Sequence, residues 1–260
     1  MTTKKPLILL TNDDGLYAEG ISTLSETLED LGEIFTVAPD QEKSATSLAL
    51  TLHHPLRVKP AKTNKFAVSG TPADCVYLAV QRFIPRSHDL LIYGINHGPK
   101  LGLQDISYSG TVAGARQGAF LDIPSIAVSL IPDKEKGFSF DFAAMIVSAI
   151  VEKILDKPLP KGMFLNVNIP PPPFKGIKIA CLGQKRYNPQ VIEKMDPRGR
   201  LYYWIGTGNP KAIGNTDSDV MVIKKGYMTV TPLQNDFKDL PSGKLSRIQK
   251  MIESIQKEIL

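Results

Sequence analysis

Two adjacent carboxylates, Asp13 and Asp14, stand near the start of the chain in the segment Thr-Asn-Asp-Asp-Gly. Like charges this close repel each other, so burying both is unfavourable unless a cation lies beside them. Hard divalent ions such as Mg²⁺ and Mn²⁺ prefer such oxygen ligands. Asn, Asp and Gly are also common turn residues, so a simple turn explains this segment equally well when it is taken alone. The pair predicts a metal site only if other oxygen ligands converge on it.

Two later loops carry such oxygen ligands. Ser44 ends the polar segment Ala-Pro-Asp-Gln-Glu-Lys-Ser, and its hydroxyl oxygen is a candidate metal ligand. Asn96, in Gly-Ile-Asn-His-Gly, offers a carbonyl oxygen to a metal or an amide donor to phosphate. The alternatives are an exposed or capping serine and a left-handed turn asparagine. We interpret the neighbouring His97 as an orienting or structural histidine.

The segment Tyr-Ser-Gly-Thr at residues 108–111 stands immediately before a predicted helix. The first N–H groups of a helix, its dipole and the hydroxyls of Ser109 and Thr111 together suit an anion, and Gly110 allows the backbone to approach it closely. We call this turn, Ser109 to Thr111, the anion cradle. An ordinary Ser or Thr helix cap is the alternative.

The elements that must position these residues alternate along the first half of the chain. Short apolar runs predict strands, and apolar residues at helical spacing predict the helices between them. The predicted strands are 6–11, 34–38, 66–68, 90–95 and 123–130, and the predicted helices begin near 21, 72, 111 and 140. This alternation indicates a mostly parallel sheet covered on both faces. The candidate oxygen ligands follow separate strands, so neighbouring strands would bring them together at the carboxyl edge of the sheet.

The second half is more irregular. We predict strands at 164–169, 177–182 and 227–231, an extended segment at 48–58, and a long hairpin that pairs 185–187 with 201–205 around a turn at 196–199. Apolar residues spaced along one face predict a C-terminal helix. We expect one domain over residues 1–260, with a hairpin excursion at 183–210 and an oligomerisation segment at 234–260.

Composition excludes several classes of protein. The net charge of +5 and pI near 9.0 suit an anionic substrate, but the lysines are scattered, which argues against a stable nucleic-acid complex. The two cysteines form no CxxC pair, and the dinucleotide and P-loop glycine patterns are absent. No apolar stretch is long enough to span a membrane, so we expect a cytoplasmic protein. A metal beside an anion cradle then favours phosphate hydrolysis over hydride transfer or kinase chemistry.

These segments together resemble the SurE family, the stationary-phase survival protein E nucleotidases. The similarity includes, in this order, ILLTNDDG, VAPDQEKS, SGTPADCV, GINHGPKLG, YSGTV, NVNIP, DPRGRLYYWIG and GYMTVTPL. Each motif is weak alone, but their joint occurrence in this order is specific.

The resemblance implies a three-layer α/β/α sandwich with a Rossmann-like sheet, a protruding hairpin, and homodimers or homotetramers. It implies phosphatase activity on 5′- and 3′-nucleotides and on short polyphosphate, with one divalent cation, Mg²⁺ or Mn²⁺, per subunit. The implied metal ligands are Asp13, Asp14, Ser44 and Asn96. The implied phosphate contacts are Asn96 and the turn from Ser109 through Gly110 to Thr111, and Asn12 is predicted to join them.

Two positions depart from the family pattern. Ala45 follows the metal-site serine where glycine is usual, which predicts a stiffer loop. Tyr93 stands where a small residue, often serine, is usual, which predicts an altered pocket floor.

Asp13 or Asp14 is expected to orient or activate water for attack on phosphorus, and direct carboxylate attack is the open alternative. The alternative function is that of a non-catalytic nucleotide-binding regulatory protein on the same fold.

Overall fold

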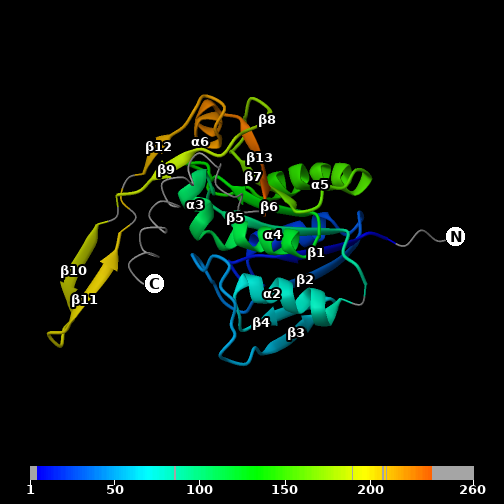
Figure 1. The fold of residues 1–260 in the computed structure, drawn as a ribbon, viewed down its shortest axis with the longest axis horizontal. Coiled ribbons are helices and arrows are strands. Elements are labelled where there is room, and N and C mark those ends of the chain that lie inside the picture. The colour runs from blue at the N-terminus through cyan, green and yellow to red at the C-terminus, as the bar shows by residue number, and fades with distance from the viewer. Residues whose placement is uncertain (1–4, 85, 189, 207, 209, 236–260) are drawn as a thin grey trace, which may run out of the picture.

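The computed structural model describes residues 5–235 except residues 85, 189, 207 and 209. Within that part of the chain, a nine-stranded sheet has the strand order β3-β4-β2-β1-β5-β6-β7-β13-β8 (Figure 1). Its strands are β1 Leu7–Thr11, β2 Glu33–Pro39, β3 Val58–Lys62, β4 Lys65–Val68, β5 Leu90–His97, β6 Ser125–Leu130, β7 Met163–Ile169, β8 Ile177–Ile179 and β13 Met228–Gln234. The pairs from β4 through β7 are parallel, whereas β3 pairs antiparallel with β4 and β13 pairs antiparallel with β7.

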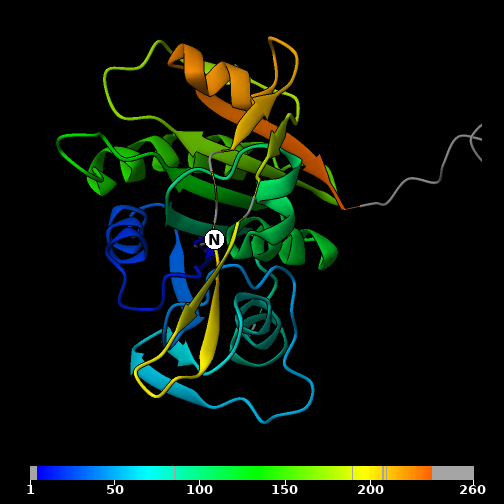
Figure 2. The ribbon, with the colours of Figure 1, turned by 90° about the vertical axis from the view of Figure 1, so that its left-hand side faces the viewer.

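Helices cover both faces of the sheet, as Figure 2 shows. The longer helices are α1 Glu19–Thr27, α2 Pro72–Leu78 with the π-helix Ala79–Phe83, α4 Gly110–Phe120 and α5 Phe140–Asp156. Apolar residues of α1 and α5 form one core with the sheet, and those of α2 and α4 form the other. The central strands are apolar on both sides because both of their faces are buried. The predicted three-layer fold is therefore confirmed.

The order of the strands reverses at β1. The chain places β2 on one side of β1 and later returns to place β5 on the other side. In open parallel sheets, the crevice outside such a reversal is where ligands bind. The strands β2, β1 and β5 are adjacent, so the loops that carry Ser44, Asp13 and Asn96 meet at one edge.

The hairpin prediction was right about the turn and wrong about the partners. Strand β10 Val191–Met195 pairs with β11 Leu201–Ile205, while β9 Gln184–Arg186 pairs with β12 Lys211–Ile213. The turn is fixed by Asp196, whose side chain accepts hydrogen bonds from the backbone of Arg198 and Arg200. A hairpin with a tight turn pairs the residues next to it, so 201–205 cannot reach 185–187. Figure 1 shows β10 and β11 projecting away from the sheet.

Two other differences concern short elements. Residues 48–57 form no strand; the predicted extended segment becomes β3 only at Val58, and Pro60 lies inside this edge strand, where one missing donor is tolerated. Helix α3 Gly102–Tyr108 was not predicted, because its seven residues are too few for a helical pattern to stand out. A short helix α6 Asp219–Val222 with the 3₁₀ turn Ile223–Lys225 precedes β13. The predicted C-terminal helix lies outside the described residues.

Candidate active site at the carboxyl edge of the sheet

Asn12 holds the turn that follows β1. Its side-chain nitrogen donates to the carbonyl of Gly15 at 2.8 Å, and its side-chain oxygen accepts from the Gly15 N–H at 3.1 Å. Gly15 has a φ of +102°, which glycine adopts without strain. Both polar ends of Asn12 are thus engaged in shaping the loop that carries the acidic pair. Its predicted phosphate contact stays a prediction.

Asp13 is a buried carboxylate at the end of β1, with only 2% of its surface exposed. Burial, together with the charge of Asp14, raises its pKa from 3.8 to about 6, although Lys100 and a hydrogen bond from Thr111 act in the opposite direction. The Thr111 hydroxyl lies 3.1 Å from Asp13 Oδ1. The surroundings of Asp13 therefore stabilise its ionised form only in part. A cation beside the carboxylate would stabilise that form further.

Asp14 points towards His97 at the end of β5. His97 Nδ1 lies 3.1 Å from Asp14 Oδ2, yet this buried oxygen has no hydrogen bond of normal geometry within the described part of the chain. The His97 ring packs edge-on against Phe138 and Phe140, which fixes its orientation. This arrangement fits the predicted orienting role of His97, and it leaves an oxygen of Asp14 with capacity for a further ligand.

Asn96 lies near the end of β5 and Ser44 in the loop after β2, the strands on either side of β1. Asn96 is buried, and its Nδ2 donates to the carbonyls of His97 and Gly98, so the amide oxygen faces away from those groups. Ser44 is exposed, and its hydroxyl lies 2.7 Å from Glu42 Oε1. The backbone N–H of Lys43 donates to the backbone carbonyl of Asp13 at 2.8 Å. This bond connects the loop after β2, which we call the serine loop (residues 40–57), to the turn that carries Asp13 and Asp14.

The rest of the serine loop is anchored to two helices. Thr51 donates from its N–H and its hydroxyl to Asp74 at the start of α2, at 2.9 and 2.6 Å. Ser47 donates to the carbonyl of Ser107 in α3. Ala45 has a φ of +57°, a left-handed conformation that costs about 1 kcal/mol in a residue with a side chain. The departure from glycine at this position therefore falls on backbone that glycine would adopt more easily.

Helix α4 begins against the acidic pair. Ser109 caps the helix by accepting from the Val112 N–H at 3.1 Å, and the start of a helix leaves the N–H groups of Gly110 and Thr111 without intrahelical acceptors. A Cβ atom on Gly110 would lie 3.0 Å from Asp13 Oδ2, so the absence of a side chain lets the carboxylate and the helix start come together. The predicted anion cradle and the acidic pair are thus side by side.

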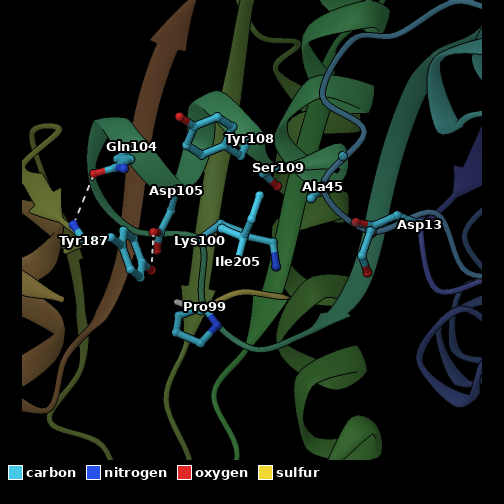
Figure 3. A pocket seen from close by; sticks show the side chains of 13 residues that line it. Asp13, Ala45, Pro99, Lys100, Gln104, Asp105, Tyr108, Ser109, Tyr187 and Ile205 are labelled. Atoms are coloured by element: carbon cyan, nitrogen blue, oxygen red, sulfur yellow. Dashed lines mark hydrogen bonds between the residues drawn. The ribbon is translucent and has the colours of Figure 1, made fainter. Parts of the chain in front are cut away.

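A pocket of about 710 Å³ opens beside this helix start, within the range typical of small-molecule sites. Asp13, Ser44, Ser109 and Gly110 line it, together with residues of α3 and of the hairpin base. Figure 3 shows Asp13 at one end and Tyr187 at the other. Asp14, Asn96 and Thr111 do not line this pocket; Asp14 adjoins Asp13 in the chain, and Thr111 contacts Asp13 through its hydroxyl.

The predicted metal ligands suit a hard cation in their chemistry. The described residues contain no cluster of three or more His, Cys, Asp and Glu side chains that would hold a metal by themselves. A metal at this place would therefore need neutral oxygens beside the two carboxylates, one of which has a buried oxygen without a hydrogen bond among the described residues. Ser44, in the loop after β2, and Asn96, near the end of β5, carry neutral oxygens of the kind that Mg²⁺ or Mn²⁺ accepts.

Sequence reasoning missed three residues of the pocket wall. Asp105, on α3, accepts from the Tyr187 hydroxyl at 2.6 Å and from Lys185 Nζ at 2.7 Å, which joins the helix to the hairpin base. Lys100 lies between these groups and Asp13. Its signal was present in the sequence, because it follows Asn96 in the same short loop. Tyr187 and Asp105 gave no signal, since their meeting depends on the tertiary fold.

Tyr93 is fully buried near Asp13 and does not line the pocket. Burial and the nearby Asp13 carboxylate raise the pKa of its phenol well above the usual range, so the group stays neutral. Its ring lies directly under Gly114 of α4, where a Cβ atom would approach two ring carbons to 2.0 Å. The bulky tyrosine is thus accommodated by a glycine on the helix above it.

Comparisons with known proteins agree on one family. A family model described as survival protein SurE matches residues 8–189. A protein named 5′-nucleotidase SurE from Syntrophotalea carbinolica is 42% identical over 91% of this chain and 94% of its own length. Another of that name from Pelotomaculum thermopropionicum is 43% identical over 95% of each chain. The crystal structure of the SurE protein from Aquifex aeolicus superposes with a TM-score of 0.79 at 38% identity, covering 95% of this chain and all of that one.

Proposed function

This chain belongs to the SurE family, and we propose from that membership and from the site that it is a divalent-metal phosphohydrolase acting on nucleoside monophosphates. The observation that carries the proposal is the buried carboxylate of Asp13, with Asp14 next to it in the chain, lying against the start of α4 at one end of a pocket large enough for a nucleotide. Phosphate can bind at the anion cradle only if a cation is also present, because the two neighbouring carboxylates alone would repel the phosphate.

Asp13, Asp14, Ser44 and Asn96 would hold the cation. When bound, it would neutralise negative charge that develops on the phosphoryl group during hydrolysis. The chain itself supplies the complementary donors: the N–H groups at the start of α4 are fixed before substrate arrives, while the hydroxyl of Thr111 donates to Asp13 and holds that carboxylate in place. Such preorganised donors stabilise a charged transition state without costly reorganisation.

The acidic pair is also placed to handle the attacking group. Asp14 is oriented by His97, and Asp13 is oriented by Thr111. Either carboxylate can hold an attacking water through a hydrogen bond, and a direct attack by a carboxylate on phosphorus is the second route. The stereochemistry at a chiral, isotopically labelled phosphorus distinguishes them, because one displacement by water inverts the configuration, whereas two displacements through an aspartyl-phosphate retain it.

The far end of the pocket fits the nucleoside. Tyr187 lies at that end, and Tyr108 and Ile205 add aromatic and apolar surface between it and Asp13. The phosphate and the nucleoside would occupy different ends of the pocket. We therefore extend the proposal to 3′-monophosphates and to short polyphosphate, because these compounds can also place a phosphate group at the phosphate end.

We propose a homodimer or homotetramer assembled through the hairpin. One face of β10 and β11 carries exposed apolar residues, and Ile205 at its base is 80% exposed although it lines the pocket. The register places Val191, Met195, Leu201, Tyr203 and Ile205 on this face together with Glu193, and the opposite face carries Ile192, Tyr202 and Trp204 together with Lys194. An exposed apolar surface of this kind is typical of association sites.

Leu201→Glu on that face is expected to lower the mass in solution from a multiple of the 28.5 kDa chain to that of a smaller species, measured by light scattering after gel filtration. Lys194→Glu, which changes a charge on the opposite face of the hairpin, serves as the control. A wild-type protein that is monomeric at micromolar concentration contradicts the proposal.

We also propose a cytoplasmic location. The two cysteines, Cys75 and Cys181, are both free, as is usual in a reducing compartment. No helix among the described residues combines the length and apolar character needed to cross a bilayer.

The central test is phosphate release from a panel of 5′- and 3′-monophosphates and short polyphosphate, before and after EDTA and with Mg²⁺ or Mn²⁺ restored. We expect chelation to lower turnover at least about a hundredfold and the added cation to restore it, because the site relies on that charge. Tight nucleotide binding with no phosphate release would instead identify a non-catalytic binding protein. Phosphate release that is unaffected by EDTA would contradict the proposed dependence on a divalent metal.

A further inference from the structure

Lys100 is a cation in the pocket that the mechanism so far does not use. It lines the same pocket as Asp13, Ser109 and Gly110, and Figure 3 shows its side chain extending from the loop towards the Asp13 end. Among the residues that the structure describes, its amino group makes no ion pair or side-chain hydrogen bond. A partly buried ammonium group at the mouth of an anion cradle is a natural contact for a phosphate oxygen.

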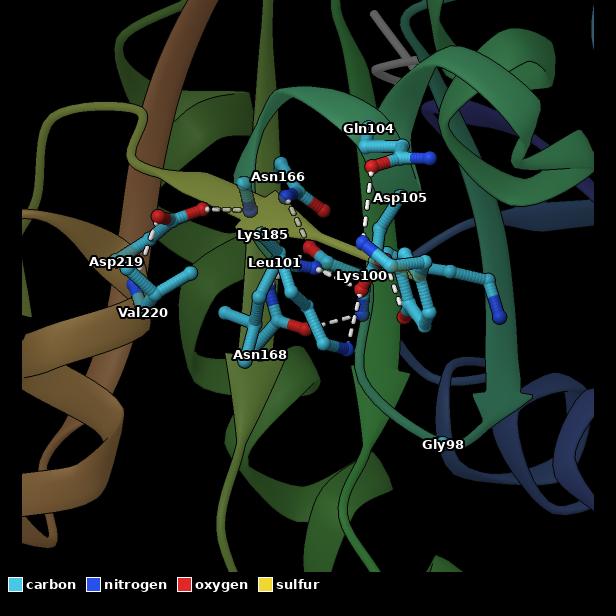
Figure 4. Close-up of polar contacts among 12 residues, drawn as sticks. Gly98, Lys100, Leu101, Gln104, Asp105, Asn166, Asn168, Lys185, Asp219 and Val220 are labelled. Carbon is cyan, nitrogen blue, oxygen red and sulfur yellow. Dashed lines mark hydrogen bonds and ion pairs between the residues drawn. The ribbon is translucent and has the colours of Figure 1, made fainter. Parts of the chain in front are cut away.

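The backbone of Lys100 is held by two buried asparagines of β7. Asn166 Nδ2 donates to the Lys100 carbonyl at 2.8 Å, and Asn168 Nδ2 donates to the same oxygen at 3.1 Å. The Lys100 N–H in turn donates to Asn168 Oδ1 at 2.8 Å. Both asparagines are fully buried and stand two residues apart, on one face of the strand (Figure 4). Polar side chains this deeply buried destabilise a fold unless they form hydrogen bonds. Here both asparagines form hydrogen bonds with the backbone of Lys100.

The residues after Lys100 are held as firmly. The Leu101 N–H donates to Asp105 Oδ2 at 3.2 Å, and the Gly102 N–H donates to Asp219 Oδ2 at 2.7 Å. The loop that carries Lys100 is therefore attached to β7, α3 and α6 at consecutive positions. The side chain of Lys100 is directed into the pocket.

We propose that Lys100 binds a non-bridging oxygen of the substrate phosphate, and that Asn166 and Asn168 are positioning residues that hold it there. The proposal rests on the proposed function, because it takes the pocket to be the phosphate site. Lys100 then adds positive charge near the Asp13 end of the pocket, and it favours substrates with a terminal phosphate dianion.

Lys100→Met tests the proposal, since methionine keeps most of the side-chain volume and removes the charge. We expect KM for nucleotides, and the inhibition constant of inorganic phosphate, to rise about 10- to 100-fold, as expected for the loss of one hydrogen bond to a charged group. The change in kcat should be smaller. Lys100→Arg keeps the charge and should stay within several-fold of wild type. Lys59→Met, which removes an exposed lysine on β3, should change neither constant.

Asn168→Ala separates positioning from folding. It removes two of the three hydrogen bonds to Lys100 and should raise KM in the wild-type background. In the Lys100→Met background it should raise KM no further, because the group being positioned is gone. Equal rises in both backgrounds would overturn the positioning role.

A second readout needs no turnover. Inorganic phosphate should raise the thermal midpoint of the wild type, with Mg²⁺ present, more than that of Lys100→Met. If both proteins are stabilised equally and KM is unchanged, Lys100 does not contact phosphate, while an active wild type leaves the proposed function standing. If the wild type releases no phosphate, the proposed function fails, and the phosphate-induced shift still decides the role of Lys100.

Discussion

Asp13→Asn is expected to abolish metal-dependent phosphate release and, at the same time, to stabilise the metal-free protein. Turnover should fall at least about a thousandfold, because the amide cannot balance the cation's charge and holds it weakly. The stability gain follows from the burial of this carboxylate, whose pKa is raised to about 6. A neutral amide at the same place carries no desolvation penalty for charge, and the metal-free melting temperature in EDTA at pH 8 should rise by several degrees.

The control is Asp40→Asn, which removes an exposed carboxylate from the neighbouring loop. It should retain turnover and leave the melting temperature within about 1 °C, as expected for a surface substitution. Full turnover of Asp13→Asn would rule out this residue as a ligand. Loss of turnover with a lower melting temperature would show that the carboxylate is structural.

The same burial gives the metal-free protein a defined dependence on pH. The folded state binds a proton at Asp13 more tightly than the unfolded chain does, for which 3.8 is the ordinary pKa. Between pH 3.8 and about 6 the folded protein therefore holds more protons at this site, and this contribution to its stability falls as the pH rises. The Asp13→Asn variant should lack this part of the slope, which urea unfolding in EDTA measures.

Gly114→Ala is expected to destabilise the protein by about 3 kcal/mol or more, although alanine favours helices over glycine by about 1 kcal/mol. The new methyl group would lie 2.0 Å from two carbons of the Tyr93 ring, and both residues are buried between α4 and β5. The ring is enclosed, so the helix must move off the sheet or the ring must displace its neighbours. Because α4 begins at the anion cradle, activity should fall with stability.

The partner substitution decides whether the contact is the cause. Tyr93→Ser removes the ring and should restore much of the stability lost in Gly114→Ala. Tyr93→Phe keeps the ring carbons and should restore none. Urea unfolding of the two double variants measures the difference, and an equal recovery in both would contradict the steric explanation.

The sequence predicted the main fold because its signals are local. Apolar runs mark the buried strands, and helical spacing marks α1, α4 and α5, since burial on both faces of a parallel sheet constrains every residue of its strands. The short helix α3 and the partners of β9 and β11 were missed. Seven residues carry too little periodicity, and alternation along a strand does not say which strand lies beside it.

By itself, the sequence determined which residues have the chemistry for the site: an acidic pair, two neutral oxygens and a helix start, each placed after a recognisable element. The tertiary structure alone decided their environment. Whether Asp13 is buried, which groups orient Asp14, and how Lys100 is held depend on strand order and on contacts between residues far apart in the chain. Charge and hydrogen-bonding capacity belong to a residue type, whereas desolvation and proximity arise only when separate segments pack together.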